Sequence, residues 1–386
     1  MAVPRGRHSG RARTRRLYGG LVSGPRGRLV EQIRHSGVKL SPELIAAFAR
    51  VPREAFVPEG FQRRDGSWVL PADKDFLATV YTDDVLVTKM DGRVPTSSSS
   101  QPSLMALMIM ALDVHPGERV LEIGAGTGYN AALLAALGAE VVSIDVQEDV
   151  ANRARSALAR AGISGVRVEQ GDGYDGFPPV RFDRVIVTVG VTGISPRWLA
   201  QLTPEGLVIA PVEHAGFHPV LAVRARGDRV VASVVSPSGF MVAAGPLTAG
   251  HPGSFPAPAA ADSMVELVDY TGPRFAGPLD GSAYRDLWYA AGVWHRRAAH
   301  AAIPPHEQSC LMLLDEPRTG GAAILPDGTV LAGGDEATEY ATDAVAILDR
   351  WLAEGRPPMT AWRVGLTLSG DRHAPIWVPT DWELPR

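Results

Sequence analysis

The chain has 386 residues, more than the roughly 100–200 that usually share one core, so we expect two domains or one domain with a large extension. An apolar fraction of 45% and a charged fraction of 21% exclude a wholly disordered or fibrous protein. No uncharged apolar run reaches the roughly 18–20 residues that cross a bilayer, and no apolar signal-peptide core follows the basic N-terminus. We therefore expect a soluble, cytoplasmic protein with no membrane partner.

The charge distribution argues against a nucleic-acid-binding protein, because the net charge is −4. Residues 1–28 are an exception, since they carry eight arginines and no acidic residue. This segment is either a disordered, solvated tail or an arm that docks an acidic partner. Cys310 is the only cysteine, which excludes an internal disulfide and a multi-cysteine metal site.

The N-terminal part predicts helices that are separated by a loop. Ser41 followed by Pro42 is typical of a helix start. A loop is expected from Tyr81–Asp84 to the serine run Ser97–Ser100, and Gln101-Pro102 then opens an apolar helix. The expected helices cover residues 29–34, 44–50 and 103–112.

The middle of the chain alternates short apolar strands with helices, a pattern that favours a parallel sheet covered on both faces. A two-stranded hairpin follows at 221–226 and 229–235. The expected strands are 119–123, 141–145, 166–170, 184–189 and 207–211, and the expected helical segments are 131–137, 150–161 and 196–202.

The composition changes near residue 247. Residues 247–262 are rich in proline, alanine and glycine and predict a linker. Residues 263–386 contain six of the eight tryptophans, which form either a core or a peptide-binding face. They predict a small α+β domain with helices at 282–302 and 336–354 and strands at 311–314, 364–368 and 376–378. The expected organisation is thus a basic tail at 1–28, an α/β domain at 29–246, a linker and a C-terminal accessory domain at 263–386.

A glycine-rich turn between a strand and a helix predicts a nucleotide-type ligand. Gly124, Gly126 and Gly128 allow a sharp turn and close approach of a ligand to the backbone. Asp145 ends the next strand, where a carboxylate can accept both hydroxyls of a ribose. A further acidic residue, Asp172, follows the third strand between two glycines.

The glycine spacing differs from the dinucleotide pattern and resembles the S-adenosylmethionine site of class I methyltransferases. That cofactor has no phosphate to place against a helix N-terminus. The resemblance implies a class I (Rossmann-like) α/β sheet and a contact between Asp172 and the adenine amine. The expected cofactor-binding residues are Glu122, Gly124, Gly126, Gly128, Asp145, Asp172, Gly173 and Thr188.

Several further segments resemble the protein-L-isoaspartate O-methyltransferase family, and the resemblance covers roughly residues 29–245. They are VPREAFVPE at 51–59, YTDD at 81–84, SQP at 100–102, GDGY at 171–174, FDRVIVT at 182–188 and LVIAPV at 207–212. The resemblance implies methyl transfer to a side-chain carboxylate of a peptide or protein. It also implies that Ser100 is the active-site hydroxyl that holds this carboxylate, with Ser98 and Ser99 beside it. A carboxylate is ionised at neutral pH, so alignment suffices and no general base is needed.

Two departures from the family bear on the substrate. Thr96–Ser100 replaces the usual Gly-Gln-Thr-Ile-Ser, and the chain continues beyond residue 247. Both features resemble family variants that tailor ribosomally made peptides. We therefore expect methylation of an aspartate in a precursor peptide, leading to aspartimide or isoaspartate, with the C-terminal domain recognising that peptide. The alternative is a general repair enzyme that methylates isoaspartyl residues in proteins.

Three other hypotheses remain weaker. The arginine-rich segment would suit an RNA methyltransferase, and an intact cofactor site without catalysis would suit a binding module. A metal site could be proposed from His295, His300, His306 and Cys310, but their spacing matches no usual zinc pattern. We expect no metal and no nucleic-acid partner.

Overall fold

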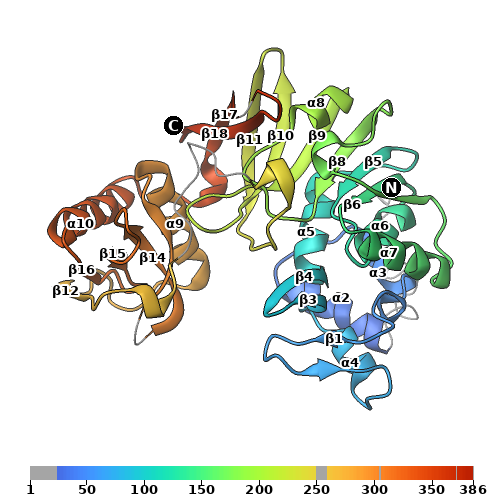
Figure 1. The fold of residues 1–386 in the computed structure, drawn as a ribbon, viewed down its shortest axis with the longest axis horizontal. Coiled ribbons are helices and arrows are strands. Elements are labelled where there is room, and N and C mark those ends of the chain that lie inside the picture. Colours follow the sequence, from blue (N-terminus) through green and yellow to red (C-terminus); the bar gives the residue numbers. More distant parts are fainter. Residues whose placement is uncertain (1–23, 249–258, 304–305, 371, 386) are drawn as a thin grey trace, which may run out of the picture. The chain divides into compact units, whose positions relative to one another are not determined.

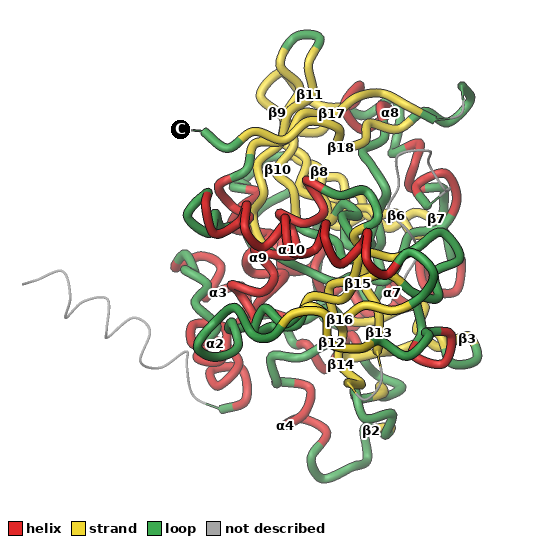
Figure 2. Tube along the Cα trace, turned by 90° about the vertical axis from the view of Figure 1, so that its left-hand side faces the viewer, coloured by secondary structure: helices red, strands yellow, loops and turns green. Residues whose placement is uncertain are grey.

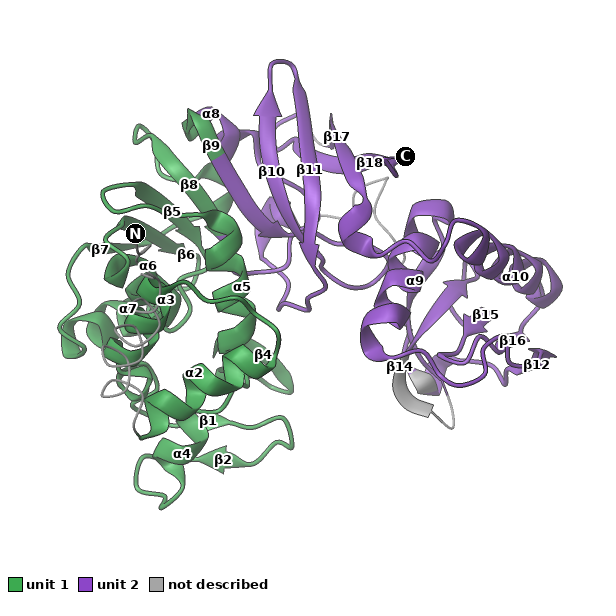
Figure 3. Cartoon of the chain, turned by 180° about the vertical axis from the view of Figure 1, so that it is seen from behind, with its two compact units in different colours: residues 1–186, 201–206 green, residues 187–200, 207–386 purple. Residues whose placement is uncertain are grey.

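The structure, a computed structural model, describes residues 24–248, 259–303, 306–370 and 372–385 (Figure 1). The chain forms two compact units (Figure 3). Unit 1 comprises residues 1–186 and 201–206, and unit 2 comprises residues 187–200 and 207–386. Most of the arginine-rich segment and of the expected linker, residues 1–23 and 249–258, lies outside the described residues.

Unit 1 begins with helix α2 (Pro25–His35), which starts earlier than the sequence predicts. Pro25 occupies the first turn, where its missing N–H costs nothing, and the apolar face of the helix is buried. Arg26 therefore belongs to a helix and not to the expected tail. Helix α3 (Pro42–Arg50) confirms the predicted start, since the Ser41 hydroxyl accepts a hydrogen bond from the N–H of Leu44 at 3.1 Å.

A small antiparallel sheet of unit 1 contains the serine run. Its strands, in the order β2-β1-β3-β4, are β2 (Trp68–Val69), β1 (Phe61–Gln62), β3 (Leu86–Asp91) and β4 (Val94–Ser99). The predicted loop is therefore wrong for most of the serine run. Ser97 and Ser99 alternate with less buried neighbours, as a strand requires, and their buried hydroxyls find polar partners. The remaining short elements here are η1 (Arg53–Phe56) and α4 (Phe76–Val80).

The parallel strands of unit 1 confirm the class I methyltransferase fold (Figure 3). In the order β8-β5-β6-β7 they are β8 (Phe182–Val187), β5 (Arg119–Ile123), β6 (Glu140–Asp145) and β7 (Val166–Gln170). The register places Val120 opposite Val141 and Val141 opposite Val166, so the carboxyl ends of β5, β6 and β7 meet at one edge. The helices are α5 (Pro102–Leu112), α6 (Tyr129–Ala136) and α7 (Glu148–Arg160).

Unit 2 contains an antiparallel set of strands that includes the end of the chain. The order is β18-β17-β11-β10-β9, with β9 (Leu202–Pro211), which belongs to unit 2 from Leu207 on, β10 (Val220–Arg226), β11 (Arg229–Ser236), β17 (Arg363–Ser369) and β18 (Ile376–Glu383). Strands β17 and β18 were expected in the C-terminal domain, but β17 pairs with β11, with Val364 opposite Ala232. Helix α8 (Pro196–Gln201) precedes β9, and the short turns are η3 (Gly245–Leu247), η4 (Ala261–Ser263) and η5 (Met359–Ala361).

A second, five-stranded sheet of unit 2 forms the C-terminal α+β part. Its order is β12-β16-β15-β14-β13, with β12 (Val268–Thr271), β16 (Val330–Gly333), β15 (Gly321–Ile324), β14 (His306–Leu314) and β13 (Ala298–Ile303). Helices α9 (Gly281–Trp294) and α10 (Ala337–Ala353) lie on the same side of this sheet in Figure 2. Trp288 and Trp351 are buried core residues.

The predicted helix 282–302 is wrong beyond Trp294. Residues 298–303 alternate between buried and less buried positions and pair along β14, which a helix could not do. Tertiary pairing thus overrides an alanine-rich segment that favours a helix when considered alone. Among the described residues, none of the helices is both long and apolar enough to span a membrane.

Candidate active site

The glycine turn at the end of β5 has the backbone geometry that only glycine adopts easily. Gly124, Gly126 and Gly128 have φ angles of +96°, +52° and +84°. The N–H groups of Gly124 and Ala125 both donate to the carbonyl of Ile144, at 2.8 and 3.1 Å, and so fix the turn against β6. A cofactor can therefore approach the main chain of this turn.

Asp145 lies at the end of β6 beside this turn. Its Oδ2 accepts a hydrogen bond from the N–H of Gly126 and its Oδ1 accepts one from the N–H of Gln147, both at 3.0 Å. Burial raises the pKa of this carboxyl, and the two N–H donors oppose the rise. Each oxygen retains acceptor capacity beyond its one amide, so the carboxylate fits the two hydroxyls of a ribose.

Asp172 lies at the neighbouring strand end. Its Oδ1 accepts a hydrogen bond from the N–H of Tyr174 at 2.9 Å and caps a short turn, and its side chain is exposed. The N–H of Gly171 donates to the carbonyl of Asp145 at 3.0 Å, which joins the two strand ends. A Cβ on Gly173 would lie 2.5 Å from Cγ2 of Ile123, so this loop packs directly on the end of β5. The structure thus gathers both predicted carboxylates at one edge.

Glu122 and Thr188 occupy different surroundings. Glu122 is fully buried, and its two oxygens accept hydrogen bonds from Asn130 Nδ2, at 2.7 Å, and from the Ser143 hydroxyl. Burial raises the pKa of Glu122 to about 7, although both hydrogen bonds lower it. Through these two buried hydrogen bonds, Glu122 connects β5 to α6 and to β6. Thr188 directly follows β8 and belongs to unit 2, so its cofactor role stays a prediction.

Arg53, which the sequence did not single out, joins the serine run to the YTDD segment. This arginine has no exposed surface, and its guanidinium lies 5.6 Å from the ring centre of Tyr129. It donates to the hydroxyl of Ser99 at 3.4 Å and to the carbonyl of Ser100 at 3.1 Å. Its other bonds run to the carbonyls of Val80, Thr82 and Asp84, at 2.8–2.9 Å. Burial lowers the pKa of Arg53 to about 10, so it remains charged at neutral pH.

A second network holds the YTDD segment against the N-terminal helices. The hydroxyl of Tyr81 accepts hydrogen bonds from Arg26 Nε at 3.0 Å and from the N–H of Arg53 at 3.1 Å. It donates in turn to Glu54, which also pairs with Arg26 at 3.1 Å. The carboxylate of Asp83 accepts a hydrogen bond from the N–H of Ser103 at 2.7 Å and so connects the YTDD segment to the start of α5. The VPRE, YTDD and SQP segments, far apart in sequence, form one hydrogen-bonded unit.

The three predicted catalytic serines lie between these networks. A Cβ added to Gly126 would lie 3.1 Å from the carbonyl oxygen of Ser98, which shows that β4 passes directly beside the glycine turn. Ser99 is buried and its hydroxyl accepts a hydrogen bond from Arg53, and its catalytic role stays a prediction. Ser98 and Ser100 are half-buried and flank it. Hydroxyl donors at these two positions suit a carboxylate that must be held near a cofactor on the turn.

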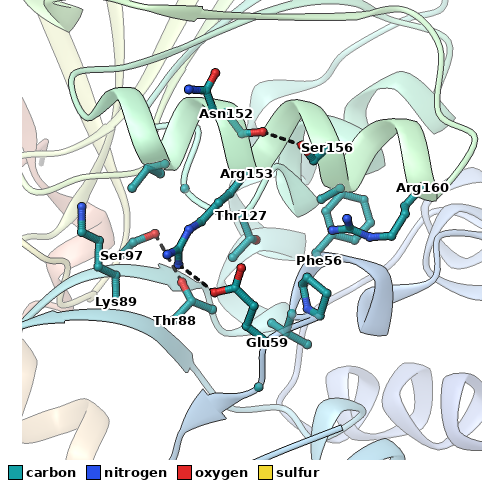
Figure 4. Close-up of a pocket in the computed structure, with 16 residues that line it drawn as sticks. Phe56, Glu59, Thr88, Lys89, Ser97, Thr127, Asn152, Arg153, Ser156 and Arg160 are labelled. Atoms are coloured by element: carbon teal, nitrogen blue, oxygen red, sulfur yellow. Dashed lines mark hydrogen bonds and ion pairs between the residues drawn. The ribbon is translucent and has the colours of Figure 1, made fainter.

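A pocket of about 300 Å³ adjoins the glycine turn on the side of α7 (Figure 4). Gly126 and Thr127 line this pocket, whereas Asp145 and Asp172 do not. The pocket therefore lies beside the edge of the sheet that carries the two carboxylates, which we call the cofactor edge. Its other lining residues come from the segment 56–60, from Thr88, Lys89 and Ser97, and from one face of α7.

Comparison with known proteins agrees with this geometry. The family described as Protein-L-isoaspartate(D-aspartate) O-methyltransferase (PCMT) matches residues 25–245. The protein-L-isoaspartate O-methyltransferase of Methanoculleus marisnigri is 38% identical over 47% of this chain and 73% of its own length. That of Methylorubrum populi is 35% identical over 54% of this chain and 88% of its own length.

A solved structure named protein-L-isoaspartate O-methyltransferase is similar in fold, with a TM-score of 0.52 and 24% identity, over 92% of this chain and 99% of that one. The glycine turn and the two carboxylates at the strand ends fit S-adenosylmethionine, which lacks the pyrophosphate of a dinucleotide. The chain belongs to the protein-L-isoaspartate O-methyltransferase family and is an S-adenosylmethionine-dependent carboxyl methyltransferase.

Proposed function

We propose that the acceptor is the carboxylate of isoaspartyl residues in proteins and peptides, and that the reaction is the first step of their repair. The observation that carries this proposal is the family match over residues 25–245, which spans all the motifs that build the site. Relatives that are 35–38% identical bear the isoaspartate name. The sequence alone favours an aspartate of a ribosomally made peptide as the acceptor, and the comparisons favour the alternative, an isoaspartyl residue.

The extension beyond residue 247 no longer supports the peptide-tailoring hypothesis. A solved structure that bears the isoaspartate name has a similar fold over 92% of this chain, so a chain of this extent is compatible with that activity. The serine-rich sequence at Thr96–Ser100 also has a structural role, because most of it lies in β4 and Ser99 contacts Arg53. It therefore needs no special peptide substrate to explain it.

When bound, S-adenosylmethionine supplies an electrophilic methyl group, which a carboxylate oxygen takes while the C–S bond electrons remain on sulfur. The residues of this chain hold the reactants. Asp145 and the glycine turn orient the cofactor, and the hydroxyls of Ser98 and Ser100 hold the ionised carboxylate in line. No proton moves in this step, so Arg53 acts by fixing β4 and not by acid–base chemistry.

The test is mass spectrometry of two peptides of one sequence, with isoaspartate in one and aspartate in the other, each incubated with enzyme and S-adenosylmethionine. We expect a methyl ester on the isoaspartyl peptide only, and Asp145→Ala should reduce its formation. Methylation of the aspartyl peptide alone, followed by loss of methanol, would contradict the repair proposal and restore the peptide-tailoring hypothesis.

A further inference from the structure

The pocket beside the glycine turn shares Gly126 with the cofactor site described above, but neither Asp145 nor Asp172 lines it. All of its lining residues belong to unit 1, and they come from four segments: residues 56–60, the β3–β4 hairpin, the glycine turn at Gly126 and Thr127, and helix α7. Its volume of about 300 Å³ is at the small end of ligand pockets in proteins. Figure 4 shows the side chain of Arg153 directed from α7 across the pocket towards Glu59.

The rim of the pocket carries more positive than negative charge. Lys89, Arg153 and Arg160 line it, with Glu59 as the only lining acid. Asp149, which does not line the pocket, pairs with Lys89 at 2.7 Å. Three positive side chains thus face two negative ones when Asp149 is counted, and one positive charge remains in excess. The pocket therefore favours an anionic ligand.

The ion pair between Arg153 and Glu59 is weak enough for another carboxylate to replace Glu59. Arg153 and Glu59 are separated by 3.4 Å, longer than a well-formed charged hydrogen bond, and both side chains are exposed (Figure 4). Exposed pairs of this kind contribute little to stability, so an incoming carboxylate can replace Glu59 at small cost. Lys89, by contrast, is held by Gln147 and Asp149 and offers a fixed charge.

The buried lining residues of the pocket determine which kind of anion fits. Phe56, Val57, Val150 and Ala157 are buried and apolar, while Ser97 and Thr127 supply hydroxyls. This combination suits a carboxylate on a short aliphatic stem better than a highly hydrated inorganic ion. Aspartate and glutamate side chains have that chemistry.

Strand geometry relates the pocket to the acceptor position. Ser97 lines the pocket and Ser100 lies three residues further along the same chain segment, roughly 10 Å away at the rise of a strand. An extended polypeptide substrate covers the same distance with about three residues. We propose that this pocket receives an acidic side chain of the substrate, about three residues from the carboxylate that is methylated.

This inference rests on the proposed function, and its test uses isoaspartyl peptides with the full-length enzyme. A glutamate is moved through the positions on both sides of the isoaspartate, and each peptide is compared with its glutamine counterpart. At one position about three residues away we expect KM to be about fivefold lower for glutamate, with kcat unchanged.

Variants identify the pocket as the source of this preference. Arg153→Gln and Lys89→Gln should each reduce the preference towards unity, and Arg153→Glu should make a lysine-containing peptide the better substrate. Arg34→Gln is the matched control, because Arg34 is an exposed residue of α2 outside the pocket and the net charge changes equally. The affinity for S-adenosylmethionine should remain the same in all four.

Equal KM values for glutamate and glutamine peptides at every position would overturn the inference and leave the proposed function standing. So would a preference that survives both pocket substitutions, or a loss of cofactor affinity in Arg153→Gln, which would assign the pocket to the cofactor. If no isoaspartyl peptide is methylated, the proposed function fails, and this inference fails with it.

Discussion

The cofactor edge and the acceptor edge of unit 1 are built in different ways. The cofactor edge is made of strand ends, a glycine turn and two carboxylates that follow β6 and β7. The acceptor edge depends on one buried arginine that bonds to residues between positions 80 and 100. Local backbone geometry therefore determines the first, and long-range side-chain contacts determine the second. Substitution of the buried arginine at the acceptor edge should accordingly affect folding, and substitution of a carboxylate at the cofactor edge should affect binding.

Arg53→Ala is expected to have the largest effect. It leaves the carbonyls of Val80, Thr82, Asp84 and Ser100 without their buried donor, so the free energy of unfolding should fall by about 3–5 kcal/mol. Urea denaturation measures this loss. Arg64→Ala, which breaks an exposed pair with Asp84, should cost less than about 1 kcal/mol, and equal losses in both variants would contradict the comparison.

Glu122 should make stability depend on pH in an unusual direction. Its folded pKa of about 7 lies above the ordinary value of 4.5, so the folded state holds a proton that the unfolded state releases between these values. Its contribution to the free energy of unfolding should therefore fall by on the order of 3 kcal/mol as the pH rises from about 4.5 to 7. Glu122→Gln should remove this slope, as unfolding measured at pH 5 and pH 8 would reveal; the same slope in both proteins would contradict the assignment.

Asp145→Ala tests the cofactor edge. The loss of charge-assisted hydrogen bonds to a ribose should weaken S-adenosylmethionine binding by about 1–3 kcal/mol, as measured by isothermal titration calorimetry. Asp149→Ala, an exposed carboxylate four residues away that pairs with Lys89, should leave that affinity almost unchanged. Equal affinities of Asp145→Ala and the parent would disprove the ribose assignment.

Ser100→Ala should have the smallest effect. Removal of one hydroxyl donor to the acceptor carboxylate should lower kcat/KM for an isoaspartyl peptide by about tenfold, roughly 1.4 kcal/mol. Cofactor affinity and stability should stay at the parental values. Full activity in this variant, with a loss in Ser98→Ala instead, would transfer the role to Ser98.

The difference between the two edges also explains what sequence could predict. Every strand of the parallel sheet and the positions of Gly124, Gly126, Gly128, Asp145 and Asp172 follow from local pattern, because each strand end carries its own signal. Arg53 gave only a weak signal, a charged residue within the VPRE segment, since its partners lie up to 47 residues away. Likewise, β17 pairs on one side with β11, roughly 130 residues earlier in the chain, and no local pattern specifies such a pairing.

The hydrogen bond between Arg26 and Tyr81 has a practical consequence for experiments on the arginine-rich N-terminus. A truncation at residue 28, where the sequence suggests that the tail ends, would delete an arginine that anchors the acceptor edge through Tyr81 and Glu54. Lost activity in such a truncation would be misinterpreted as evidence for the tail. A chain that begins at Gly24 removes six of the eight arginines and keeps this anchor intact.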